Sequence, residues 1–230
     1  MRNLQICLAI TLLVAASSFK LLSTASDNSN NDQQTTISNE VEGESTDSLT
    51  ISFSNDDNKI ARFCAYLPYA KQAQAETGIH ASVILAQAAL ESGWGEYAVG
   101  NMFFGIKDTE KGATGKGQLL RTTEYFSSPD QTHLFPKVYS VKWNNKRKMY
   151  KYDVLDWFRK YDSPAESFKD HARFIVENDR YAEAMKYASD PIRFVQEISK
   201  AGYATAPGYA RLMVKMVRMI QSENARVIGS

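Results

Sequence analysis

One glutamate stands where a helix pattern ends. Alanine-rich helix formers from Leu85 onward run into Glu91, and Gly93 and Gly95 then supply the backbone freedom that ends a helix. A carboxyl group at this place meets the negative end of the helix dipole and apolar neighbours, and both favour its protonated form. An acid that keeps its proton near neutral pH suits general acid catalysis of glycosidic bond cleavage. The sequence therefore predicts Glu91 as a proton donor; the alternative is a solvated glutamate at a frayed helix end.

Three further side chains are candidates to serve Glu91. Gln87 lies one turn earlier on the same helix face, where it either orients the carboxyl group or satisfies the polar demand of a core position. Trp94 either offers an apolar face to a sugar ring or anchors the helix end in the core. Tyr203 follows Gly202 and so projects from a helix terminus, which favours a role in the site.

Other catalytic chemistries lack their sequence signatures. The three histidines have no metal-ligand spacing, and no His-Glu-x-x-His or Cys-x-x-Cys motif occurs. No Gly-x-Ser-x-Gly elbow and no phosphate-binding glycine loop is present either. We therefore expect neither a metal nor a cofactor.

The N-terminus has the pattern of an export signal. Arg2 precedes the apolar run from Ile6 to Ala16, which is too short to span a bilayer as a stable helix. We predict a signal peptide over 1–25, cleaved after Ala16 or Ala25, with an uncleaved membrane anchor as the alternative. Export to the periplasm, the cell envelope or the outside would follow, with no stable membrane span after cleavage.

A polar, acidic segment separates this signal from the rest. Residues 26–58 contain eight acidic residues and no lysine or arginine, and this composition predicts a disordered linker. Residues 59–230 then carry 25 basic and 18 acidic residues, a net charge of +7, whereas the whole chain has +1. In an exported protein this charge favours an anionic envelope polymer over nucleic acid as partner.

Residues 59–230 read as one mainly helical α+β domain. Helical periodicity and capping residues predict helices over 60–76 with a kink or restart at Pro68, and over 81–92, 163–178, 180–188, 190–202 and 205–222. Strand-forming residues predict two strands over 118–126 and 152–161, joined by a long basic and aromatic hairpin or flap.

Four sequence blocks, in order, resemble the glucosaminidase domain of glycoside hydrolase family 73, which occurs in bacterial autolysins and in the flagellar peptidoglycan hydrolase. They are Leu-Ala-Gln-Ala-Ala-Leu-Glu-Ser-Gly-Trp-Gly at 85–95, Asn-Met-Phe-Phe-Gly-Ile-Lys at 101–107, Thr-Thr-Glu-Tyr at 122–125 with Phe-Arg-Lys-Tyr-Asp-Ser at 158–163, and Ala-Gly-Tyr-Ala-Thr at 201–205. The resemblance implies a lysozyme-like, two-lobed fold with a small β-hairpin beside the substrate groove.

The resemblance also implies roles for individual residues. Glu91 matches the family's general acid, Glu124 its second carboxylate, and Tyr203 a tyrosine of the catalytic centre. The other predicted substrate-binding residues are Gln87, Trp94, Asn101, Phe104, Tyr161 and Asp162. The chain departs from the family pattern at Met102, at Ala206 and in the longer hairpin after Glu124.

We therefore expect a peptidoglycan endo-β-N-acetylglucosaminidase that acts on glycan strands, with no prediction of a protein partner. A lytic transglycosylase or a muramidase is the alternative among enzymes. A non-catalytic module that binds cell-wall glycan is the alternative from another class. The sequence leaves open whether Glu124 activates water or supports assistance by the acetamide of the substrate.

Overall fold

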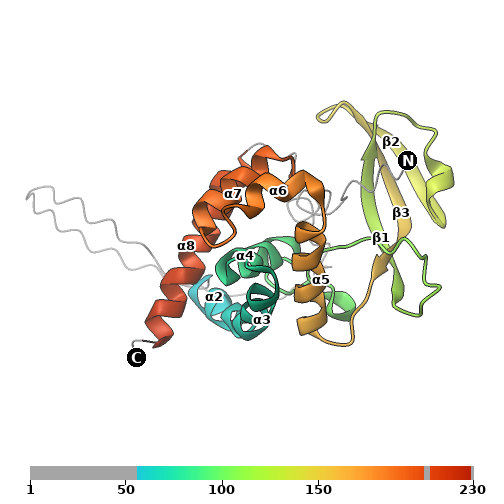
Figure 1. Cartoon of the computed structure of the whole chain (residues 1–230). Helices are drawn as coiled ribbons and strands as arrows, with labels where there is room; N and C mark the ends of the chain where they lie inside the picture. Colours follow the sequence, from blue (N-terminus) through green and yellow to red (C-terminus); the bar gives the residue numbers. More distant parts are fainter. Residues whose placement is uncertain (1–55, 205–207, 229–230) are drawn as a thin grey trace, which may run out of the picture.

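The computed structural model describes residues 56–204 and 208–228, so the predicted signal peptide and most of the predicted linker lie outside it. The predicted mixture of helices and a small sheet is confirmed, with the helices forming one body and the sheet projecting beside α5 (Figure 1). The elements are α2 (Asp56–Cys64), α3 (Leu67–Thr77), α4 (Ala81–Glu91), β1 (Gly117–Phe126), β2 (Lys137–Asn144), β3 (Met149–Arg159), α5 (Pro164–Val176), α6 (Ala182–Met185), α7 (Pro191–Lys200) and α8 (Tyr209–Ile228).

Several predicted boundaries differ from those of the structure; for example, the strand predicted over 152–161 spans Met149–Arg159, and the helix predicted over 180–188 spans only Ala182–Met185. Residues 56–58, predicted as linker, belong to α2. Helix α8 continues to Ile228, beyond the predicted end near Ser222. Its last turns are stabilised by an ion pair between Arg226 and Glu223, at 2.7 Å and one helical turn apart.

Prolines and short polar side chains set the starts of several helices. Pro68 lies in the first turn of α3, so the predicted restart at this residue is confirmed. The Ser163 hydroxyl accepts a hydrogen bond from the Glu166 backbone N–H at 3.4 Å and caps α5. The Asp190 carboxylate caps α7 in the same way.

Helix α4 is the centre of the helical body and packs against α3, α5, α7 and α8. Every residue of α4 except Leu90 is buried, because its sequence is apolar on all faces. The ring of His80 caps its start by accepting a hydrogen bond from the Ser82 backbone N–H. Within the described ranges, no helix combines the length and the apolar character needed to cross a membrane.

The sheet has three antiparallel strands in the order β1-β3-β2, rather than the two strands that we predicted. The predicted strands correspond to β1 and β3, and β2 comes from the segment predicted as part of a hairpin or flap. The lysines within β2 obscure, in the sequence, the alternation of apolar and polar residues that indicates a strand. They suit its place at the edge of the sheet, where charged side chains oppose pairing with other chains.

One carboxylate, that of Asp170, fastens the end of the sheet to the helical body. Asp170 of α5 accepts two hydrogen bonds of 2.7 Å from Arg159 Nη1, at the end of β3. It also accepts one of 2.6 Å from the Tyr161 hydroxyl. Two partners from one connecting segment therefore depend on a single side chain of α5.

We expect Asp170→Asn to lower the free energy of unfolding by about 1–3 kcal/mol, because Arg159 loses its anionic partner and one of the two acceptor oxygens becomes a donor group. Asp153→Asn is the matched control. That carboxylate is as exposed as Asp170 but pairs with the more exposed Arg121, so it should lower stability by less than about 1 kcal/mol. Urea denaturation of both variants measures the difference, and equal losses would contradict an anchoring role for Asp170.

Candidate active site

The end of α4 is a tight turn built around Ser92. The Ser92 hydroxyl donates to the Ala88 carbonyl at 2.6 Å and accepts from the Gly95 backbone N–H at 2.8 Å. Gly93 and Trp94 both have left-handed backbone conformations, with φ of 59° and 62°. A tryptophan rarely adopts this conformation, so the surrounding contacts impose it. The turn fixes the chain direction just after Glu91.

Glu91 is the last residue of α4 and is buried, with only 7% of its surface exposed. Among the described residues, its Oε2 atom has no hydrogen-bond partner. Burial in this apolar setting raises the pKa of Glu91 to about 8. The carboxyl group therefore keeps its proton at neutral pH, as the sequence predicted for a general acid.

Gln87 and Tyr209 form one side of the surroundings of Glu91. The Gln87 amide Nε2 donates to the Tyr209 hydroxyl at 3.5 Å, at the long limit of a hydrogen bond. Burial, and then the charge of Glu91, raise the pKa of Tyr209. The Tyr209 ring lies 5.7 Å from that of Tyr203. The structure thus brings Gln87 and Tyr203 into one buried group with Glu91, through a tyrosine that we did not predict.

A buried histidine extends this group. His171 Nε2 lies 2.9 Å from the Tyr203 hydroxyl, and the imidazole stacks on Phe104 with ring centroids 3.8 Å apart. Burial lowers the pKa of His171 to about 3, so the ring is neutral at working pH. The Tyr203 hydroxyl is therefore held by a neutral imidazole ring. The Phe104 ring, stacked on the face of this imidazole, fixes its orientation.

Glu124 belongs to a second cluster, on the sheet. Its carboxylate is almost fully buried and accepts a hydrogen bond of 2.7 Å from Lys107 Nζ. The same ammonium group donates to Asp156 of β3, also at 2.7 Å. This cluster borders a hollow of about 210 Å³, with its remaining walls formed by Asp108, Lys111, Phe126, Leu134, Phe135 and Trp157.

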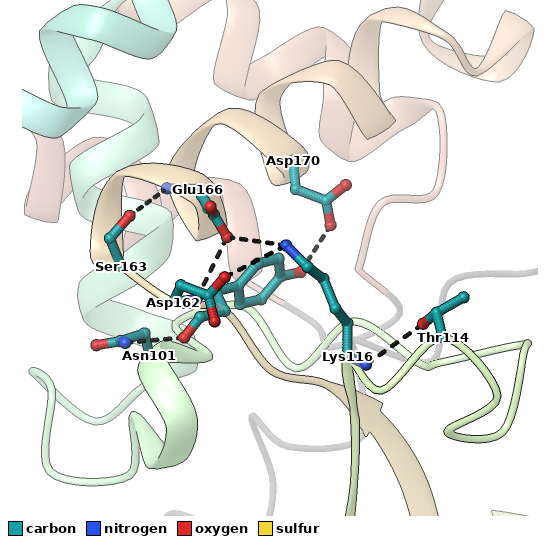
Figure 2. A network of polar contacts seen from close by, with 8 residues as sticks. Asn101, Thr114, Lys116, Asp162, Ser163, Glu166 and Asp170 are labelled. Atoms are coloured by element: carbon teal, nitrogen blue, oxygen red, sulfur yellow. Dashed lines mark hydrogen bonds and ion pairs between the residues drawn. The ribbon is translucent and has the colours of Figure 1, made fainter.

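The other predicted site residues make mainly architectural contacts. Trp94 is half-buried and packs edge-on against Phe63 at 5.7 Å. Asn101 donates from Nδ2 to the Tyr161 carbonyl at 2.9 Å, and the exposed Asp162 lies 3.5 Å from the Lys116 ammonium (Figure 2). Phe104 is 1% exposed and faces His171 rather than solvent.

The described residues contain no cluster of side chains suited to a metal ion. Within residues 56–204 and 208–228, no group of three or more histidine, cysteine, aspartate or glutamate side chains is arranged to hold a metal ion.

A family model described as glucosaminidase, mannosyl-glycoprotein endo-β-N-acetylglucosaminidase, matches residues 67–222. The match covers α3 through most of α8 and includes both glutamates. The chain belongs to the glucosaminidase family. The predicted resemblance to a family of glycoside hydrolases is confirmed.

Individual members of the glucosaminidase family show how far the likeness extends. The peptidoglycan hydrolase FlgJ of Pseudomonas aeruginosa is 34% identical over 166 residues, which are 69% of this chain and 36% of that protein. FlgJ of Vibrio cholerae is 32% identical over 68% of this chain and 42% of its own length. The chain thus spans less than half of these relatives.

A solved structure supports the fold of this glucosaminidase domain. The glycoside hydrolase domain of Salmonella typhimurium FlgJ aligns with a TM-score of 0.52 and 28% identity, over 76% of this chain and 93% of that domain. The predicted lysozyme-like architecture is thereby confirmed.

Sequence reasoning missed four residues of the two clusters. His171 was considered only as a metal ligand, although its place on the buried face of α5 marked it as a core residue. Lys107 closes the second resemblance block, which was a usable signal. Asp156 and Tyr209 carried no signal of their own, because tertiary packing alone brings them to the glutamates.

The raised pKa of Glu91 has a consequence for stability. The unfolded chain loses this proton near pH 4.5 and the folded chain near pH 8, so ionisation favours unfolding between these values. We expect wild-type stability to fall by a few kcal/mol across this window through Glu91, on the order of 1.4 kcal/mol per pH unit at most. Glu91→Gln should remove this fall.

Urea denaturation from pH 4 to pH 9 tests the effect. Glu96→Gln is the control, because Glu96 is exposed on the turn that follows and pairs with Lys59 at the surface. Its pH profile should follow that of the wild type. Parallel profiles for wild type and Glu91→Gln would show that Glu91 titrates alike in the folded and unfolded chains.

Proposed function

We propose that this chain is an exported peptidoglycan hydrolase that cleaves β-1,4 bonds of the glycan strand as an endo-β-N-acetylglucosaminidase. Family membership supports the reaction type, and the printed name of the FlgJ relatives supports the polymer. The observation that carries the proposal is the burial of Glu91 at the end of α4, because it supplies a protonated carboxyl group at neutral pH.

In the proposed reaction, Glu91 donates its proton to the oxygen of the leaving sugar. The C–O bond then breaks, and positive charge develops on the ring of N-acetylglucosamine. Water captures this centre, and its proton leaves to a base. Since the charge of Glu91 is poorly solvated where it sits, the acid has a strong tendency to recover a proton before the next turnover.

Glu124 is the second carboxylate of the proposal. Paired with Lys107, it stabilises the positive charge on the sugar ring and orients either the attacking water or the acetamide of the substrate. Tyr203, held by His171, is proposed to contact the sugar at the cleavage point, and Gln87 to orient the Glu91 carboxyl group. Trp94, Asn101, Phe104, Tyr161 and Asp162 are proposed to shape the substrate groove, chiefly by holding its walls in place.

Export is part of the proposal and rests on the sequence. A signal peptide over 1–25 would deliver the domain to the cell envelope, where peptidoglycan lies, and the acidic segment from residue 26 to the start of α2 would tether it. The net charge of +7 in residues 59–230 favours contact with an anionic wall polymer.

We expect Glu91→Gln to lower kcat on purified glycan strands by about 10²–10⁴-fold, the usual scale for loss of a general acid. Glu96→Gln, the exposed control, should retain wild-type turnover. Mass spectrometry of the wild-type digest should find reducing-end N-acetylglucosamine.

Four other outcomes would contradict parts of this assignment. Near wild-type turnover by Glu91→Gln would remove Glu91 from the acid role. Anhydro sugar ends would identify a lytic transglycosylase, and reducing-end muramic acid a muramidase. Binding to glycan without any cleavage by the wild type would indicate a glycan-binding module.

Removal of residues 1–53 tests the tether. The shortened chain keeps all of α2, so we expect an unchanged Tm and unchanged turnover on soluble glycan fragments. Differential scanning calorimetry and a fragment assay provide the two readings. A fall in Tm of several degrees would show that the removed segment stabilises the domain.

A further inference from the structure

Lys107 stands between two carboxylates of different strands. Its ammonium nitrogen lies 2.7 Å from Oε1 of Glu124 on β1 and 2.7 Å from Oδ2 of Asp156 on β3. The side chains are 21%, 2% and 19% exposed, in the order Lys107, Glu124, Asp156. Screening by water is therefore weak, and the ion pairs are stronger than surface pairs.

The position of Lys107 is fixed from several sides. Its backbone pairs with Phe158 of β3, and its ammonium lies 4.0 Å from the centre of the Phe158 ring. The second oxygen of Asp156 accepts a hydrogen bond of 2.8 Å from the Trp157 backbone N–H. Lysine and aspartate thus both have contacts that do not involve Glu124, and the lysine is one of the groups that hold the Glu124 carboxylate.

Other charged and titratable groups lie near this cluster. Asp108 accepts hydrogen bonds from the backbone N–H groups of Glu110 and Gly112, within its own loop. The Tyr152 hydroxyl, from the residue opposite Glu124 on β3, donates to the Ser128 carbonyl. Lys111 lines the same hollow, but no ion pair joins it to either carboxylate of the cluster within the described residues. Lys107 is therefore the cation that bridges the two carboxylates.

We propose that Lys107 is a positioning residue that offsets the repulsion between Glu124 and Asp156, and that Asp156 is a third acidic member of the site. Two carboxylates on one nitrogen would repel each other if the ammonium were absent, and one of them would take up a proton. With Lys107 present, two acidic side chains share one basic side chain beside the hollow. An excess of acidic groups suits the positive sugar ring of the proposed reaction, and this inference rests on that function.

Lys107→Met tests the charge while it keeps most of the apolar stem. We expect the acid limb of the pH profile of kcat/KM to move to higher pH by about 1–3 units, the usual influence of an adjacent cation on a carboxylate. Lys107→Arg retains the cation and should keep the wild-type limb. If the acid limb of the Lys107→Met profile lies at the same pH as in the wild type, whatever the value of kcat/KM, the proposal is overturned.

The double variant Lys107→Met with Asp156→Asn separates charge from structure. Removing the second carboxylate removes the repulsion, so we expect the acid limb to return toward lower pH relative to Lys107→Met alone. A merely structural role for Lys107 would not allow this rescue. An acid limb identical in the single and double variants would therefore contradict the proposal.

A reading without substrate keeps this test independent of the proposed function. ¹³C NMR of the side-chain carboxyl groups, with Glu124→Gln for assignment, gives the pH at which Glu124 takes up its proton. In Asp156→Asn, which retains Lys107, the loss of a competing anion should move this pH downward, even if Lys107→Met does not fold. An unchanged or higher midpoint would overturn the coupling, whereas full activity of Glu91→Gln would overturn only the proposed general acid.

Discussion

The structure depends on the burial of one carboxyl group at the end of an apolar helix. Helix α4 is surrounded by four other helices, and Glu91 is its last residue. Moving a charge into such a place is expensive, so the group stays neutral instead. The turn around Ser92 and the left-handed conformation of Trp94 then direct the chain away at once. The packing that stabilises the domain is also what prepares the acid.

The second carboxylate, that of Glu124, has a different environment. Glu124 is as deeply buried as Glu91, yet it faces a cation at 2.7 Å, whereas Oε2 of Glu91 has no hydrogen-bond partner among the described residues. Burial thus favours the protonated form of one carboxyl group, while the other is paired with a cation, a contrast that suits the proposed glycosidic cleavage. The helical body supplies the first environment and the sheet supplies the second.

The sequence predicted the helical part of this arrangement well, because its signals are local. Apolar continuity and paired glycines located α4 and Glu91, and Pro68 marked the restart of α3. Strand β2 was not predicted, because a segment rich in lysine is typical of a solvated loop. Its strand conformation depends on pairing with β3, which the local sequence does not reveal. Asp156 and Tyr209 could not be predicted either, since pairing of strands and packing of α8, not sequence spacing, bring them to Glu124 and Glu91.

The most direct measurement is the titration of Glu91 itself. The wild-type protein, labelled with ¹³C at glutamate carboxyl carbons and assigned by comparison with Glu91→Gln, would be followed by NMR from pH 3 to pH 10. Burial predicts a midpoint near pH 8 for Glu91. A midpoint near 4.5, the value of an ordinary solvated glutamate, would contradict the central claim that the fold keeps this acid protonated at neutral pH.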